Sequence, residues 1–122
     1  MDAILGMHRQ LATVLVLYYA LVGLWGLVNG IRNLGPTSGL RGGLVIAEVA
    51  AIAQGLMGMV LFFFYRAPSD SLHILYGVAM VVAMPLAATY TRDRAPRGQA
   101  LALGFAALFT AGLAIRGIMT AG

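Results

Sequence analysis

The sequence contains only two histidines, His8 and His73, and each lies near the start of a long apolar segment. An imidazole ring offers a nitrogen lone pair that can bind a metal ion or the iron of a haem group. Glu48 is the one charged residue of another apolar segment, and there it is a candidate for binding a proton. Ionisable groups in apolar segments cost several kcal/mol unless they are paired or reach water. The informative positions are therefore His8, Arg9, Glu48, His73 and Arg116.

The composition is that of an integral membrane protein. Of the 122 residues, 61% are hydrophobic and only 10% are charged, whereas a soluble domain has about a quarter charged residues. This excludes an ordinary water-soluble fold, a disordered chain and a nucleic-acid-binding module. The pI of about 10.1 comes from eight arginines against four acidic residues, with no lysine.

Several chemistries are excluded by missing residues or motifs. The chain has no cysteine, which rules out disulfides, cysteine-ligated zinc, iron–sulfur clusters and covalently attached haem. It also has no glycine-rich phosphate loop, nucleophile elbow or catalytic triad, so a hydrolase or kinase of the soluble type is excluded.

Four apolar segments are long enough to cross a bilayer, for which about 20 helical residues are needed. They span approximately residues 3–31, 42–65, 71–91 and 98–119. The connections are short and rich in turn residues, so consecutive helices are expected to be antiparallel. The sequence therefore predicts an all-α fold, a four-helix transmembrane bundle running up-down-up-down as a single integral membrane domain over residues 1–122.

The eight arginines are divided unequally between the two ends of this bundle. The first and third connections carry five of them: Arg32, Arg41, Arg92, Arg94 and Arg97. The other end carries Arg66 in its connection and Arg9 and Arg116 near helix ends. Because arginine-rich loops stay in the cytoplasm, both termini are predicted on the outer, periplasmic face of a bacterial inner membrane.

The two histidines are predicted to lie at one face of the membrane. The first and third helices of such a bundle run parallel and diagonally opposite, roughly 12–14 Å apart if neighbours are about 8–10 Å apart. That gap suits a flat macrocycle with an imidazole on each side of its iron, and haem b needs no cysteine. Gly77, four residues after His73, would let a porphyrin approach the helix backbone. His8 and His73 are thus predicted as axial ligands of one haem b.

Three arginines converge on the same end. Arg9, Arg66 and Arg116 could bind the two carboxylates of a haem, since guanidinium groups bind carboxylates bidentately. A second interpretation stays open, in which the histidines only contact lipid headgroups and the arginines reach lipid phosphate.

The segment Leu72-His73-Ile74-Leu75-Tyr76-Gly77, together with His8 and four apolar helices, resembles the cytochrome b561-like four-helix modules. The resemblance implies haem b held by histidines on separate helices, with electrons passing between quinol, ascorbate or a protein donor and an acceptor. Many members carry four or more helix histidines and two haems, whereas this chain can hold one haem at most. Electron transfer across the bilayer would therefore need a partner, such as a larger respiratory or redox complex.

Two further functions stay open. Glu48 could bind a proton in a proton-coupled small-molecule transporter, or it could simply pair with Arg41, Arg92, Arg94 or Asn29. A single membrane glutamate also resembles the small multidrug resistance transporters, although those proteins have it in the first helix and this chain has it in the second. The small residues of the first, second and fourth helices predict close helix packing. They also suit a non-catalytic accessory subunit in a homo- or hetero-oligomer.

Overall fold

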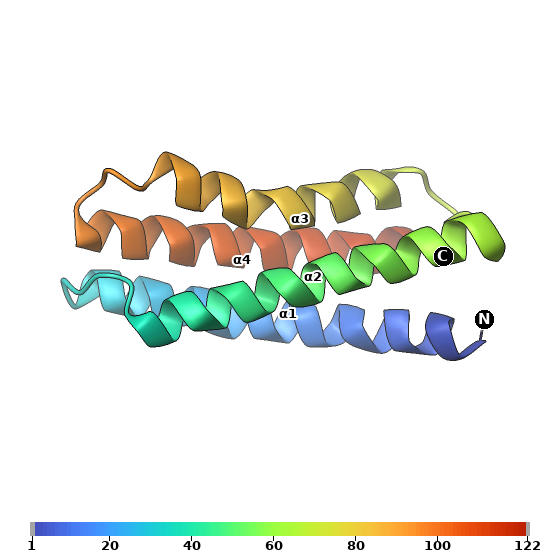
Figure 1. The fold of residues 1–122 in the computed structure, drawn as a ribbon, viewed down its shortest axis with the longest axis horizontal. Coiled ribbons are helices and arrows are strands. Elements are labelled where there is room, and N and C mark those ends of the chain that lie inside the picture. Colours follow the sequence, from blue (N-terminus) through green and yellow to red (C-terminus); the bar gives the residue numbers. More distant parts are fainter. Residues whose placement is uncertain (1, 122) are drawn as a thin grey trace.

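A computed structural model describes residues 2–121, and it confirms the all-α, four-helix architecture (Figure 1). The helices are α1 (Asp2–Ile31), α2 (Ser38–Phe64), α3 (Leu72–Tyr90) and α4 (Pro96–Thr120). Each of them is long and apolar enough to cross a membrane. The architecture is thus consistent with a multi-pass membrane protein. The terminal residues Met1 and Gly122, which belong to the predicted domain 1–122, lie outside the described residues.

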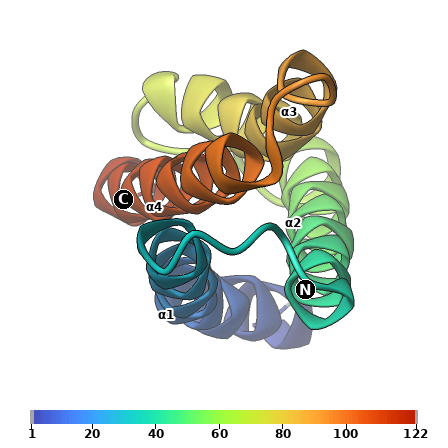
Figure 2. The same cartoon turned by 90° about the vertical axis from the view of Figure 1, so that its left-hand side faces the viewer.

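The four helices form a ring in which α1 and α3 are diagonally opposite (Figure 2). The most extensive contact is between α1 and α4, which closes the ring, and the least extensive is between α2 and α3. Consecutive helices run in opposite directions, so the ends of α1 and α4 that carry the termini lie at the same end as the α2–α3 connection (Figure 1). This end is called the terminal end below, and the other is called the arginine-rich end.

Two helices begin earlier than the sequence predicted. Helix α2 starts at residue 38 instead of 42, because the Thr37 hydroxyl accepts a hydrogen bond from the Leu40 amide at 3.1 Å and caps the helix. Helix α4 starts at Pro96 instead of residue 98, since proline suits the first helical position. The Asp70 carboxylate accepts from the Leu72 amide at 2.9 Å at the start of α3. The apolar runs marked the membrane spans, and the polar first turns extend beyond them.

Helices α1 and α4 touch through their backbones. A Cβ atom added to Gly26 would lie 2.8 Å from the Cα of Gly104, and one added to Gly104 would lie 2.6 Å from the Leu27 nitrogen. Within lipid, helix association depends on van der Waals fit and favours small residues at such contacts. The rest of this face of α4 is also mostly small and buried: Ala100, Leu103, Ala107, Ala111 and Ala114.

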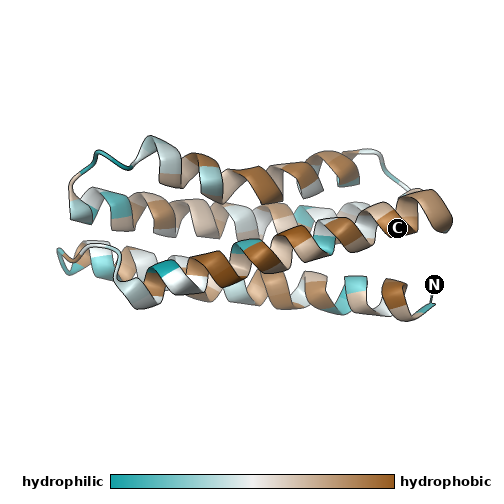
Figure 3. Ribbon diagram, in the orientation of Figure 1, coloured by the Kyte–Doolittle hydropathy of each residue, from teal (hydrophilic) through white to brown (hydrophobic). Residues whose placement is uncertain are grey.

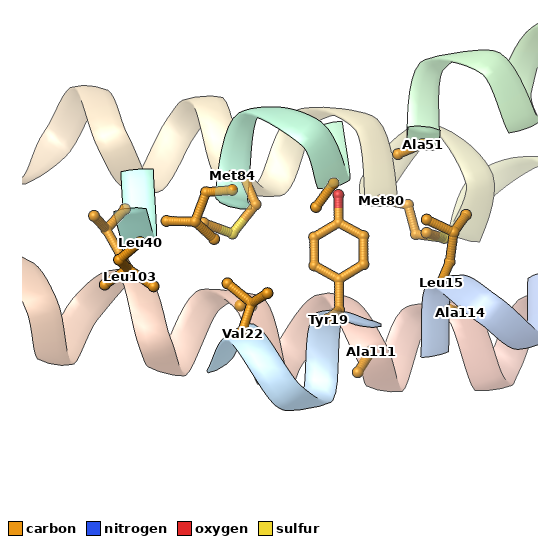
Figure 4. Packing of buried hydrophobic residues seen from close by; sticks show 13 residues of the cluster. Leu15, Tyr19, Val22, Leu40, Ala51, Met80, Met84, Leu103, Ala111 and Ala114 are labelled. Carbon is orange, nitrogen blue, oxygen red and sulfur yellow. The ribbon is translucent and has the colours of Figure 1, made fainter. Parts of the chain in front are cut away.

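Tyr19 lies at the centre of the bundle and is completely buried (Figure 4). Its ring stands between Met80 and Met84 of α3, and Leu15 and Val22 flank it along α1. Most other large apolar side chains face outward instead, and the hydropathy colouring shows apolar residues along the length of every helix (Figure 3). An apolar exterior of this kind is what a lipid-facing bundle requires.

Replacing Gly104 by alanine is expected to lower the free energy of unfolding by about 1–3 kcal/mol, because the added methyl group would overlap backbone atoms of α1. Gly112→Ala is the matched control, since nothing lies within 4 Å of its Cβ position on the same helix. Alanine is the better helix former, so this control should be neutral or stabilising by up to about 1 kcal/mol. Denaturant titration in detergent micelles measures both, and equal losses would contradict the close contact.

Candidate functional site

His8 and His73 lie side by side at the terminal end of the bundle. The centroids of their rings are 6.2 Å apart, and the ring planes make an angle of 67°. The two side chains come from α1 and α3, whose backbones do not approach each other closely, so they meet across the diagonal of the ring. Both are half-buried. The only two imidazoles of the chain, 65 positions apart in sequence (73 minus 8), are thus brought together.

A backbone carbonyl orients His73. Its Nδ1 atom lies 2.7 Å from the carbonyl oxygen of Gly117 in the last turns of α4, and the Thr120 hydroxyl lies 3.4 Å from the same nitrogen. A carbonyl can only accept, so Nδ1 carries the proton and donates it. The lone pair of a neutral ring is then on Nε2. Histidines that bind metals are commonly held in this way, by a hydrogen bond from the other ring nitrogen.

His8 is enclosed by α2. A Cβ atom at Gly58 would lie 3.3 Å from Cε1 of the His8 ring, so glycine leaves the room in which this ring sits. The Gln54 amide donates to the backbone carbonyl of His8 at 2.7 Å and ties α1 to α2 at this level. The Nδ1 atom of His8 is buried and has no hydrogen-bond partner among residues 2–121. The ring therefore still has an unused polar nitrogen.

The three predicted arginines lie at the same end and are exposed. The guanidinium of Arg116 stands over the Tyr76 ring at 5.5 Å, and that of Arg66 stands over the Tyr65 ring at 5.4 Å. In the described part of the chain, no hydrogen bond joins Arg9, Arg66 or Arg116 to a carboxylate. Their positive charge is thus free for an external anion.

Gly77 lies on the exposed side of α3, and the space around its Cβ position is empty to 4 Å. It is one turn beyond His73 in the sequence, as predicted from the i+4 spacing. No described side chain blocks the approach of a flat ligand to the helix backbone at this position.

The separation of the two imidazoles is compatible with direct edge-to-face contact of the rings and also with one metal atom between them. Metal–imidazole bonds of about 2 Å on each side separate the ring centroids by about 6 Å, and the observed separation is 6.2 Å. The angle between the rings does not oppose this, because each can rotate about its metal–nitrogen bond. Residues 2–121 contain no group of three histidine, cysteine or acidic residues that could hold a bare metal ion. A porphyrin supplies four nitrogens itself, so the donor set fits haem better than zinc.

Other buried polar atoms of α1 and α2 are also without hydrogen-bond partners. Besides His8 Nδ1, three buried oxygens have no hydrogen-bond partner among the described residues: Tyr19 Oη, Glu48 Oε1 and Gln54 Oε1. Two of the partners considered for Glu48 are engaged elsewhere. Arg41 donates to Gln99 at 3.0 Å, and the Asn29 amide lies 3.5 Å from the Gly35 carbonyl. Unpaired polar groups are costly at this depth, so Glu48 is a second candidate site.

Comparison with known protein families, curated proteins and solved structures finds no match to this chain. Its function has to be inferred from the two groups of polar residues. Sequence reasoning named His8, His73 and Glu48, but it did not find Gly58, the Gly117 carbonyl or Tyr19 as their neighbours. Gln54 carried a signal of its own, since it is a polar residue within an apolar run.

Two adjacent tyrosines provide a test of the unpaired oxygens. The Tyr18 hydroxyl donates to the Gly43 carbonyl at 2.9 Å, so Tyr18→Phe should lower the free energy of unfolding by about 0.5–1.5 kcal/mol. The Tyr19 hydroxyl is buried without a partner, so Tyr19→Phe should be neutral or stabilising. Denaturant titration of both variants decides this. A larger loss for Tyr19→Phe would show that its hydroxyl is bonded.

Proposed function

We propose that this chain is a membrane protein that binds one haem b between His8 and His73 at the terminal end of the bundle. The observation that carries the proposal is the 6.2 Å separation of two imidazoles on diagonal helices. The Gly117 carbonyl supports it, because it fixes the proton of His73 on Nδ1 and leaves Nε2 for a ligand bond.

In this proposal the chain's own residues bind and orient the group. His8 and His73 would hold the haem iron, and Arg9, Arg66 and Arg116 would bind the haem carboxylates through charge-assisted hydrogen bonds. Gly77, one turn beyond His73, has open space at its own Cβ position, where this proposal would let the group approach the helix backbone. Haem b, when bound, supplies reversible one-electron chemistry. Quinol or a larger respiratory or redox complex would be the partner, since one haem at one end does not span the bilayer.

The orientation belongs to the same proposal. The arginine-rich end carries Arg32, Arg41, Arg92, Arg94 and Arg97, which favours the cytoplasmic side. The histidine pair then faces the periplasmic side of a bacterial inner membrane, together with both termini.

An absorption spectrum tests haem binding. The protein purified in detergent from haem-replete cells should show a Soret band, with sharp α and β bands after reduction by dithionite. His8→Ala and His73→Ala should each lose the low-spin spectrum, because one axial ligand is removed. A featureless wild-type spectrum after reconstitution with haemin, or an unchanged spectrum in both variants, would contradict the proposal.

The arginine assignment has a matched control at the opposite end of the bundle. Arg116→Gln should weaken haemin binding by about tenfold, which corresponds to ~1.4 kcal/mol. Arg92→Gln should leave the affinity unchanged, because Arg92 lies in the α3–α4 connection, away from the histidines. Equal affinities in a haemin titration of the two variants would remove Arg116 from the site.

A second function is proposed on a separate observation, the buried Glu48 Oε1 that has no hydrogen-bond partner among the described residues. Proton binding would neutralise the carboxylate at this depth and remove the cost of an unpaired charge. The buried Tyr19 and Gln54 oxygens likewise have no hydrogen-bond partner among the described residues. A membrane protein with such a group suits proton-coupled transport of a small molecule.

Ethidium uptake into inverted vesicles under an imposed pH gradient tests this second function. Glu48→Gln should reduce uptake to the level of vesicles without the protein, because the amide cannot carry the proton. Asp93→Asn is the control, since Asp93 is exposed in the α3–α4 connection. Equal uptake by wild type and Glu48→Gln would exclude the transport function and leave the haem proposal unaffected.

A further inference from the structure

An open groove of about 870 Å³ runs along α4 in the arginine-rich half of the bundle, with α3 on one side and Leu27 of α1 on the other. Leu86 of α3 and Phe105 and Phe109 of α4 line it. The small side chains of Ala102 and Ala106, which also line it, leave the space between the larger residues. The groove is thus almost entirely apolar, and neither histidine contributes to it.

The exception is Arg94, which lines the groove at its outer end. Arg94 belongs to the connection between α3 and α4, and its side chain is exposed. Its guanidinium donates no hydrogen bond within residues 2–121, whereas the neighbouring Arg97 donates to the Gly30 carbonyl at 2.9 Å. The groove is therefore apolar along its length and has one guanidinium group without a hydrogen-bond partner, that of Arg94, at its outer end.

The length of the groove matches one leaflet of a membrane. The residues of α4 that line it extend from Gly98 to Phe109, which is eleven steps along the helix, or about 16 Å. Half of the hydrocarbon core of a bilayer is about 15 Å thick. A fatty acyl chain that begins at the level of Arg94 would therefore end beside Phe109, near the bilayer midplane.

We propose that this groove binds an anionic phospholipid, with one acyl chain along α4 and its phosphate on Arg94. Charge complementarity favours this occupant, because the arginine-rich end carries five arginines. The planar guanidinium group of arginine is well suited to binding phosphate. A second copy of the chain in the same orientation would bring two arginine-rich ends together. A neutral lipophilic molecule would make no use of Arg94.

Native mass spectrometry of the full chain in detergent, titrated with phosphatidylglycerol, tests the site. Wild type should retain one phosphatidylglycerol in preference to phosphatidylcholine. Arg94→Gln should lower this retention by about tenfold, whereas Arg92→Gln, in the same connection but outside the groove, should change it less than twofold. Ala102→Phe should also abolish retention by filling the groove, and Ala106→Leu serves the same purpose if Ala102→Phe fails to fold.

Four outcomes would overturn the proposal. Equal losses in Arg94→Gln and Arg92→Gln would mean that lipid is attracted only by the general charge of this end. Full retention in the groove-filling variants would place the lipid elsewhere. Displacement of the lipid by ubiquinone-10 with no effect of Arg94→Gln, or a dimer that buries the groove, would assign it to another occupant. The absorption spectrum that tests haem binding at His8 and His73 is independent of all four outcomes.

Discussion

The contact between α1 and α4 at Gly26 and Gly104 is the constraint on which the other positions depend. At this point the two backbones touch, so neither helix can rotate or slide without a collision. Helix α4 in turn packs against α3, and α1 packs against α2. The last turns of α4, held by this contact, present the Gly117 carbonyl that orients His73. The position of the carbonyl that orients His73 therefore depends on the contact between Gly26 and Gly104, which lies away from the histidine pair.

The number of helices and their membrane-spanning character could be predicted from the sequence, because apolar length alone determines them. The meeting of His8 and His73 at one end also followed, since helices 1 and 3 of an up-down bundle run parallel. The rotation of each helix about its own axis could not be predicted. Apolar residues surround these helices on every side, so no polar face distinguishes the interior from lipid. For this reason Gly58 and Tyr19 were not recognised as neighbours of the polar groups.

Among residues 2–121, the buried polar side-chain atoms without a hydrogen-bond partner all belong to α1 and α2. They occur at His8, Tyr19, Glu48 and Gln54, whereas Tyr18 and Thr110 have their hydroxyl groups satisfied by backbone carbonyls. A sequence selected only for stability would place apolar residues at the unpaired positions. Buried polar groups that lower the stability of the fold are typical of functional sites, where the residues are retained for their chemistry.

The place of the histidine pair in the ring has a thermodynamic consequence. The two imidazoles belong to α1 and α3, whose backbones do not approach each other closely, and the contact between α2 and α3 is the least extensive of the four. A ligand bound by both rings would link α1 to α3 directly. It would keep these two helices together when the contact between α2 and α3 is lost. Its binding free energy would add to that of the folded state, so resistance to unfolding would rise with ligand concentration.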